Sequence, residues 1–451
     1  MSAGRPRLLN IKPGEWGLTI SLLLILAVNT LVLELSDVVA TAGFISNVGA
    51  QEILWLWLVD MLITLLTAGV YALVVDRTAR LRLLGWLLGG FGVVYLLLAV
   101  LFFYPSPDWL RYPLLYILAD QQYVIFPLAF WVLVNDVYTL AESKRLFPVI
   151  AAGATVGSIL GNGLAAGSGV ILQRWGLTTA PLLLLGGGVL LLGFLLLWLT
   201  FRRRAIRARQ AREGQTDVRQ TIQVGLDYIR NVPIFTYLAV AMLCGGLALT
   251  VIEYHFLFTV DQAMTGDPLR FQTFYGVYKT ALIVTLLLVQ GLISGRLLEK
   301  AGLKNSFLAL PAALVVSAGL ALALPGLIGG AAARFLARLV QRAWDEPARK
   351  SLENLVPDER RGRISAFIDS YFYALSTILG CLILGLLLLI SALTSRLSPQ
   401  AVTVVYLSLA GVAALGAVAG GILLRRGYDK SLLNWRLSRS RRKSVLDGLE
   451  F

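Results

Sequence analysis

Blocks of about twenty consecutive apolar residues recur along the whole chain and constrain its fold more than any other feature. A bilayer core about 30 Å thick needs roughly 20 such residues in a helix, because every backbone N–H and C=O in lipid must be paired internally. Of the 451 residues, 57% are hydrophobic and 15% are charged, whereas soluble proteins carry roughly a quarter charged residues. The sequence therefore excludes a soluble protein and predicts a polytopic, all-α membrane protein.

The apolar blocks predict twelve transmembrane helices, of which the tenth is the least hydrophobic. The predicted spans are 16–40, 53–75, 83–104, 109–138, 147–171, 177–201, 233–258, 271–294, 306–325, 327–346, 364–390 and 401–424. The longest polar interruption, 202–232, follows the sixth block and contains a stretch with the spacing of a surface-lying helix. It divides the chain into two six-helix bundles, 1–201 and 233–424, and a basic tail, 425–451, follows.

The positive charge of the chain is concentrated on one side of these spans. The net charge is +14, and 32 of the 40 lysines and arginines fall in the segments that share a side with both termini. Short cytoplasmic loops are enriched in lysine and arginine, so both termini are predicted to be cytoplasmic and the protein to lie in the cell (inner) membrane. The charge is then a topology signal and gives no reason to expect a nucleic-acid partner.

The sequence lacks the residues that several classes of protein require. Two cysteines in apolar runs and one histidine are too few for a disulfide framework or a Cys/His metal site. No G-x-x-x-x-G-K-[ST] loop occurs, so no nucleotide-hydrolysing motor is encoded. We expect a monomer that is not an enzyme, holds no cofactor or metal and moves a small molecule by gradient or exchange.

A loop signature occurs once in each half. Residues 76–80 follow the second block, and 295–304, after the eighth, match G-x-x-x-[DE]-[RK]-x-G-x-[RK]. This resembles the loop signature of the major facilitator superfamily. The resemblance implies a cytoplasmic gating charge network, and its predicted members are Asp76, Arg77, Glu299 and Lys300. The alternative is that these charges only set topology.

A closer resemblance begins in the fourth block. Residues 130–136 read F-W-x-x-x-N-D, and 142–148 and a glycine-rich helix follow. This is similar to the ATP/ADP translocase family of bacteria and plastids, and the similarity continues at 29–60 and 346–369. It implies a nucleotide transporter. Those carriers typically place a substrate-binding lysine before the first-helix aspartate, where this chain has Ser36 before Asp37.

Cations within the bilayer suggest an anion site, because ionisable groups at this depth are costly and usually face a cavity or a partner. Arg334, Arg338 and Arg342 are spaced by four and form one ridge on the tenth helix. Guanidinium groups bind phosphate or carboxylate oxygens bidentately. We predict that Arg334, Arg338 and Lys279 bind the substrate. The alternative is ion pairing with Asp345, Glu346 or acids of the fourth helix, or contact of Arg342 with the interface.

Intramembrane acids are candidates for proton or ion coupling. Glu34 and Asp37 lie three apart and share a helix face. They either carry a coupling proton or form a salt bridge with Lys279 or Arg334. Glu253 and His255 lie on the repeat-equivalent seventh helix and are candidate partners in the same central cavity. For His255, the alternative is that it is simply solvated near an outer helix end.

Two further patterns are consistent with either substrate binding or helix packing. Asp120, Gln121 and Tyr123, with Gln122 between them, are predicted to hydrogen-bond and stack on a ring of the substrate, with packing as the alternative. Gly153, Gly157 and Gly161 recur every four residues, which is typical of close helix packing.

These features favour a secondary transporter that works by alternating access and carries an organic anion or a nucleotide, by exchange or proton coupling. One alternative is a proton-coupled exporter of amphiphilic compounds or lipids. The other is a membrane scaffold or sensor that keeps a transporter fold without transporting.

Overall fold

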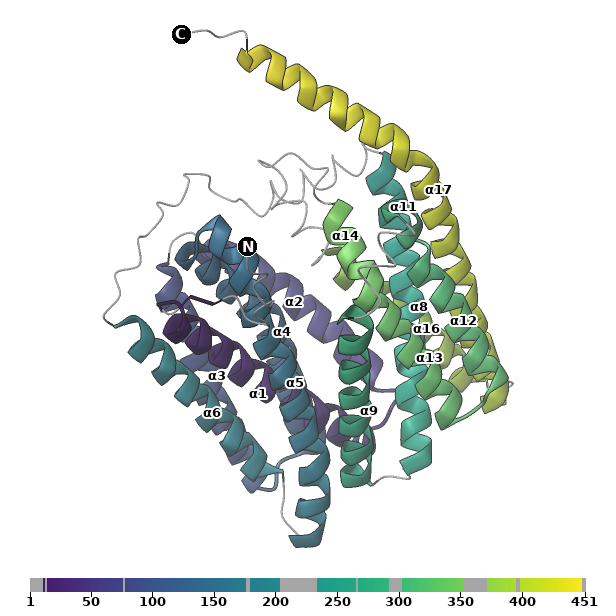
Figure 1. The fold of residues 1–451 in the computed structure, drawn as a ribbon. Coiled ribbons are helices and arrows are strands. Elements are labelled where there is room, and N and C mark those ends of the chain that lie inside the picture. The colour runs from purple at the N-terminus through teal and green to yellow at the C-terminus, as the bar shows by residue number, and fades with distance from the viewer. Residues whose placement is uncertain are drawn as a thin grey trace, which may run out of the picture. The chain divides into compact units, whose positions relative to one another are not determined.

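The computed structural model describes residues 11–12, 14–75, 78–175, 179–202, 233–264, 267–291, 302–352, 371–394 and 398–447. Nearly all of them are helical (Figure 1). Up to residue 289, the described helices are α1 (Trp16–Asn47), α2 (Ile53–Val75), α3 (Arg80–Phe103), α4 (Asp108–Val137), α5 (Leu140–Trp175), α6 (Ala180–Phe201), α8 (Pro233–Met264) and α9 (Pro268–Val289). The later helices are α11 (Leu303–Ser306), α12 (Ala309–Ala323), α13 (Leu327–Val340), α14 (Glu346–Leu352), α16 (Tyr373–Thr394) and α17 (Pro399–Asp447).

Eleven helices in the described part of the chain are long and apolar enough to cross a membrane, and the predicted all-α membrane fold is confirmed. The predicted tenth span, 327–346, is interrupted: α13 has 14 residues and continues through a π-helix, Gln341–Asp345, into α14. The last helix runs on to Asp447, well into the predicted tail. The predicted linker lies outside the described residues from 203 onward.

The chain folds into two compact units. Unit 1 consists of Met1–Glu52, Leu66–Thr216 and Met264–Val284, and unit 2 of Ile53–Leu65, Asp217–Ala263 and Thr285–Phe451. Most of α9 therefore belongs to unit 1, although it follows the predicted linker in the sequence.

Unit 1 is built around α1, which contacts α4, α5 and α6, while α3 packs on α4 and α6. The α1–α5 contact depends on the glycines at every fourth position of α5. A Cβ atom on Gly153, Gly157 or Gly161 would lie only 2.3, 2.3 or 2.4 Å from the carbonyl oxygens of the three α1 residues Leu23, Ala27 and Leu31. Because no side chain fits there, the packing interpretation of these glycines is confirmed.

Helix α9 approaches α5 in the same way. A Cβ on Gly276 would meet the backbone of Asn162 and Ala166, and one on Gly169 would meet that of Leu269. Gln272 donates to the Ala165 carbonyl at 2.8 Å and to Ser168 Oγ at 3.0 Å. Close backbone approach and these hydrogen bonds hold α9 against α5.

Unit 2 contains comparable close contacts around α8. A Cβ on Gly246 would clash with Ser376 of α16, and one on Gly380 with Thr250. On another face of α8, Gly330 of α13 lies against Thr259, where an added Cβ would be 2.5 Å from the hydroxyl. Helix α12 packs on α13 and α17.

Candidate functional site

Two carboxylates and one ammonium form an ion-pair cluster inside unit 1. Lys279 Nζ on α9 lies 2.5 Å from Glu34 Oε2 and 2.6 Å from Asp37 Oδ2, both on α1. The ammonium also lies 5.7 Å from the centre of the Tyr275 ring. Of the two alternatives for Glu34 and Asp37, the salt bridge to Lys279 is the one present here.

Two residues of α5 complete this cluster, and the sequence analysis missed both. Asn162 Nδ2 donates to Glu34 Oε2 at 3.1 Å, and Ser158 Oγ donates to Glu34 Oε1 at 3.2 Å. Asn162 is fully buried, and within the described part of the chain its Oδ1 has no hydrogen-bond partner. The available signal was an amide between two glycines inside the fifth predicted span.

An arginine cluster forms the polar centre of unit 2. Glu253 on α8 accepts from Arg334 Nε at 2.6 Å and from Arg338 Nε and Nη2 at 3.0 and 2.9 Å. Arg338 Nη1 also donates to Gln341 Oε1, and the Arg334 guanidinium lies 4.6 Å from the centre of the Phe256 ring.

The arginine cluster carries two positive charges against one negative charge. The side chain of Arg334 is 8% exposed and that of Arg338 is 22% exposed, so Arg338 is the more accessible. Its partner is Glu253, which was not among the acids considered for the arginine ridge; Asp345 instead pairs with Arg349 at 3.0 Å. The π-helix begins directly after α13, and such insertions are frequent at functional sites.

The predicted ring-binding residues of α4 differ in their exposure to solvent. Tyr123 is 57% exposed, whereas Gln121 is buried. Between these residues, Gln122 donates to Asn29 Oδ1 at 2.9 Å and accepts from the Tyr95 hydroxyl at 2.9 Å. Gln122 thus joins α1, α3 and α4, in agreement with the packing alternative for that residue.

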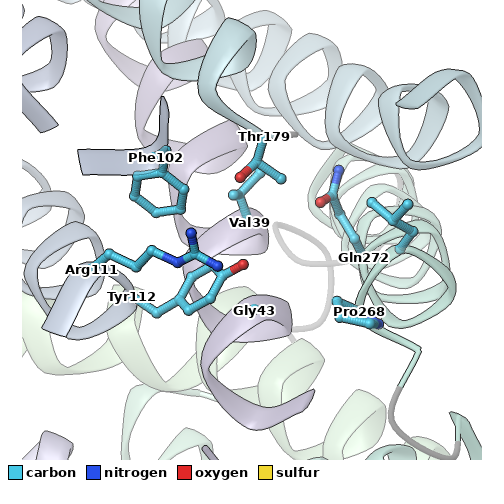
Figure 2. Close-up of a pocket in the computed structure, with 9 residues that line it drawn as sticks. Val39, Gly43, Phe102, Arg111, Tyr112, Thr179, Pro268 and Gln272 are labelled. Atoms are coloured by element: carbon cyan, nitrogen blue, oxygen red, sulfur yellow. The ribbon is translucent and has the colours of Figure 1, made fainter. Parts of the chain in front are cut away.

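A small pocket of about 200 Å³ lies elsewhere in unit 1. Figure 2 shows the Arg111 guanidinium beside the rings of Phe102 and Tyr112, with Gln272 and Pro268 across the pocket. Arg111 pairs with Asp108 at 2.5 Å and lies 5.2 and 5.1 Å from the centres of the two rings. Since its charge is balanced within its own helix turn, the pocket is a weaker anion site than the arginine cluster.

Comparison with known proteins identifies the family. The model of the TLC ATP/ADP transporter family matches residues 106–339, more than half of the chain. This chain belongs to the TLC ATP/ADP transporter family. The match spans α4, α5, α6, α8, α9, α11, α12 and most of α13, and so includes Lys279, Glu253 and both arginines. No curated protein matches the sequence.

Solved structures of transporters share the fold of this TLC family member. The nucleoside transporter NupG has a TM-score of 0.64 at 12% identity, over 90% of this chain and 98% of that one. A bacterial homologue of the iron transporter ferroportin has a TM-score of 0.61 at 16% identity, over 92% and 100%. A bacterial homologue of the human lysosomal transporter Spinster has a TM-score of 0.57 at 16% identity, over 95% and 98%. The protein is an integral, multi-pass membrane transporter with a major facilitator fold, and its family indicates transport rather than enzymatic conversion.

The predicted gating residues of this TLC transporter, Asp76, Arg77, Glu299 and Lys300, lie outside the described residues. The end of the first loop signature is described, and there Arg80 at the start of α3 pairs with Asp136 near the end of α4. Asp136 belongs to the F-W-x-x-x-N-D segment, so two sequence motifs meet in one ion pair.

His255 is buried rather than solvated near a helix end. Its side chain is 2% exposed, and Nδ1 is 2.8 Å from the Tyr406 hydroxyl of α17. The alternative of a solvated histidine is therefore wrong. The reason is that α8 continues to Met264, well past the predicted span end, so His255 lies inside the helix.

An ion pair between Glu15 and Arg145 joins the starts of α1 and α5. Arg145 donates to both carboxylate oxygens of Glu15, at 2.6 and 2.9 Å. The Arg145 hydrogen bond, with one from the Lys12 backbone, lowers the pKa of Glu15 from its ordinary 4.5 to about 2.

We expect Glu15→Gln to lower the unfolding temperature modestly at neutral pH. Because the folded-state pKa of Glu15 is lowered, its contribution is complete above pH 4.5 and is lost as the pH falls towards 2. Thermal unfolding of both proteins in detergent at about pH 7 and about pH 3 should show the difference shrinking in acid. A difference independent of pH would show that Glu15 acts through packing rather than charge.

Proposed function

We propose that this TLC family member is a secondary transporter that works by alternating access and carries an organic anion of the nucleotide type. Family membership supports the substrate class, and the arginine cluster supports the charge of the substrate. The proposal includes both exchange and proton coupling, because neither mechanism needs a domain that hydrolyses a nucleotide.

The observation that carries the proposal is the sharing of one carboxylate by two guanidinium groups. Arg334 and Arg338 both bind Glu253, so the three groups keep a net positive charge. A phosphate offers several acceptor oxygens in the geometry that guanidinium binds best. An incoming phosphate can therefore take hydrogen bonds from Arg338, the more exposed arginine, while Glu253 continues to neutralise Arg334.

The other predicted site residues enter the proposal with different roles. Glu34, Asp37 and Glu253 are proposed to couple transport to a proton or ion, because their protonation changes the charge of a buried cluster. Asp120, Gln121 and Tyr123 are proposed to contact the ring of the substrate. Lys279 stays a predicted substrate ligand, although two carboxylates hold its ammonium in this structure.

The proposal also covers the membrane topology and the domain organisation of the chain. We propose cytoplasmic termini and a cell (inner) membrane location, since 32 of 40 cations favour one side. The two six-helix halves, the gate formed by Asp76, Arg77, Glu299 and Lys300, and the monomeric state are proposed with it.

Counterflow in proteoliposomes tests this function. Vesicles preloaded with ADP should accumulate labelled ATP against empty-vesicle controls. Arg338→Gln should weaken nucleotide binding by roughly 10–100-fold, the equivalent of about 1.5–3 kcal/mol for a charge-assisted hydrogen bond. Arg342→Gln, one turn further along, is the matched control and should change binding less.

Two results would contradict the proposal. Absence of counterflow, together with no thermal stabilisation by any of a panel of nucleotides, would exclude the nucleotide substrate. Binding of lipophilic cations that Glu34→Gln abolishes would select the amphiphile exporter instead.

A further inference from the structure

The ammonium of Lys279 occupies a position in which one cation bridges two carboxylates. Its distances of 2.5 and 2.6 Å to Glu34 and Asp37 leave room for no other group between the three charges. These groups sum to one negative charge at membrane depth, where an uncompensated carboxylate is costly. If Lys279 left, both carboxylates would need another cation.

The surrounding oxygens are those that a small alkali cation prefers. Besides the two carboxylates, Ser158 and Thr41 place hydroxyl groups at the cluster, 3.2 Å from Glu34 and 3.5 Å from Asp37. Hard cations take carboxylate, amide-carbonyl and hydroxyl oxygens as ligands. The cluster thus offers more acceptor oxygens than the three N–H donors of the ammonium can bind.

Asn162 supplies an independent indication of a ligand. Its Nδ2 is committed to Glu34 Oε2 at 3.1 Å and to the Ser158 carbonyl at 2.9 Å. Its Oδ1 is buried and has no hydrogen-bond partner among the residues that the structure describes. A buried acceptor without a donor is costly. A bound cation would satisfy it, whereas the ammonium, engaged by the two carboxylates, does not.

The helix that carries Lys279 lies against α5, a helix of the other predicted half. Gln272, Thr273 and Gly276 hold α9 against α5 through backbone contacts. By sequence, α9 belongs to the second predicted half, whereas α1 and α5 belong to the first. Under the proposed alternating access, which this step assumes, α9 moves relative to α1 and withdraws the ammonium.

We propose that Glu34, Asp37 and Asn162 form a sodium site for which the ammonium of Lys279 is a tethered competitor. Lys279 fills the site while α9 is docked, and Na⁺ fills it when α9 is withdrawn. Sodium then stabilises the undocked state and links the movement of α9 to an ion gradient. The proposal adds Asn162 as a ligand and gives Lys279 the role of a counter-cation.

Thermal unfolding of the purified protein, followed by tryptophan fluorescence, tests the site without substrate or transport. Lys279→Met removes the competitor, so NaCl should raise its unfolding temperature relative to choline chloride at equal ionic strength. The expected rise is roughly 1–2 °C once Na⁺ exceeds its dissociation constant about tenfold. The double variant Glu34→Gln/Lys279→Met should lose this response. Lys12→Met, which removes an exposed lysine before α1, is the matched control and should gain none.

Each other outcome would overturn the sodium site. Equal unfolding temperatures in sodium and choline would exclude it, and a response to pH alone would replace Na⁺ with a proton. A sodium response that survives in the double variant would place the ion elsewhere. If Lys279→Met does not fold, sodium NMR line broadening by the unaltered protein, compared with Glu34→Gln, decides the question. Because neither measurement uses a nucleotide, their failure leaves the counterflow result untouched.

Discussion

Alanine at Gly157 is expected to lower the unfolding temperature of the transporter, although alanine is the better helix former. A Cβ atom there would lie 2.3 Å from the Ala27 carbonyl oxygen and 3.0 Å from the Leu31 nitrogen. Both are backbone atoms of α1, so the helices must separate. Overpacking of this kind costs about 1–3 kcal/mol, and separation would also disturb the contacts of Glu34 with Ser158 and Asn162.

Gly163 of the same helix provides the matched control, because nothing lies within 4 Å of a Cβ built on it. Gly163→Ala should leave the unfolding temperature unchanged or raise it, since alanine is favoured in helices by about 1 kcal/mol. Unfolding in detergent compares the two variants directly. Similar shifts for both would mean that α1 and α5 do not pack through these glycines.

The helices could be predicted from the sequence because their signal is a property of each segment alone. The fourth span was expected at 109–138 and α4 occupies Asp108–Val137. The interruption after α13 could not be predicted, since a π-helix is defined by which carbonyl accepts the hydrogen bond of each backbone N–H and not by hydrophobicity. Nor could the placement of α9 in unit 1, which depends on the fit of Gly276 and Gly169 between two backbones.

The candidate site was predictable as a set of residues but not as a set of pairs. Charges within apolar blocks are conspicuous, which is why Glu34, Lys279 and Glu253 could be predicted as site residues. Which acid pairs with which cation depends on helix packing, so both alternatives for Glu34 stayed open and Glu253 was not recognised as the partner of Arg338. Asn162 was missed because an uncharged amide is less conspicuous in a sequence than a charge.

Replacing Glu253 with glutamine is expected to destabilise the protein strongly. The variant keeps the side-chain volume but leaves the guanidinium groups of Arg334 and Arg338 without their shared carboxylate. Breaking a buried ion pair by removing one partner costs about 3–5 kcal/mol, because an uncompensated charge stays buried. Glu52→Gln, at an exposed position before α2, is the control and should have little effect.

Two additions to the Glu253→Gln variant, a second substitution and a nucleotide, show whether Glu253 stabilises the protein through its charge or through packing. Arg334→Met in the same chain returns the net charge of the cluster to its original single positive charge and should restore much of the lost stability, which a double-mutant cycle measures. A phosphate-bearing nucleotide should also raise the unfolding temperature of Glu253→Gln more than that of the unaltered protein, because its oxygens can replace the missing carboxylate and binding stabilises the folded state. If neither addition restores stability, Glu253 contributes through its shape, and the arginine cluster loses its support as an anion site.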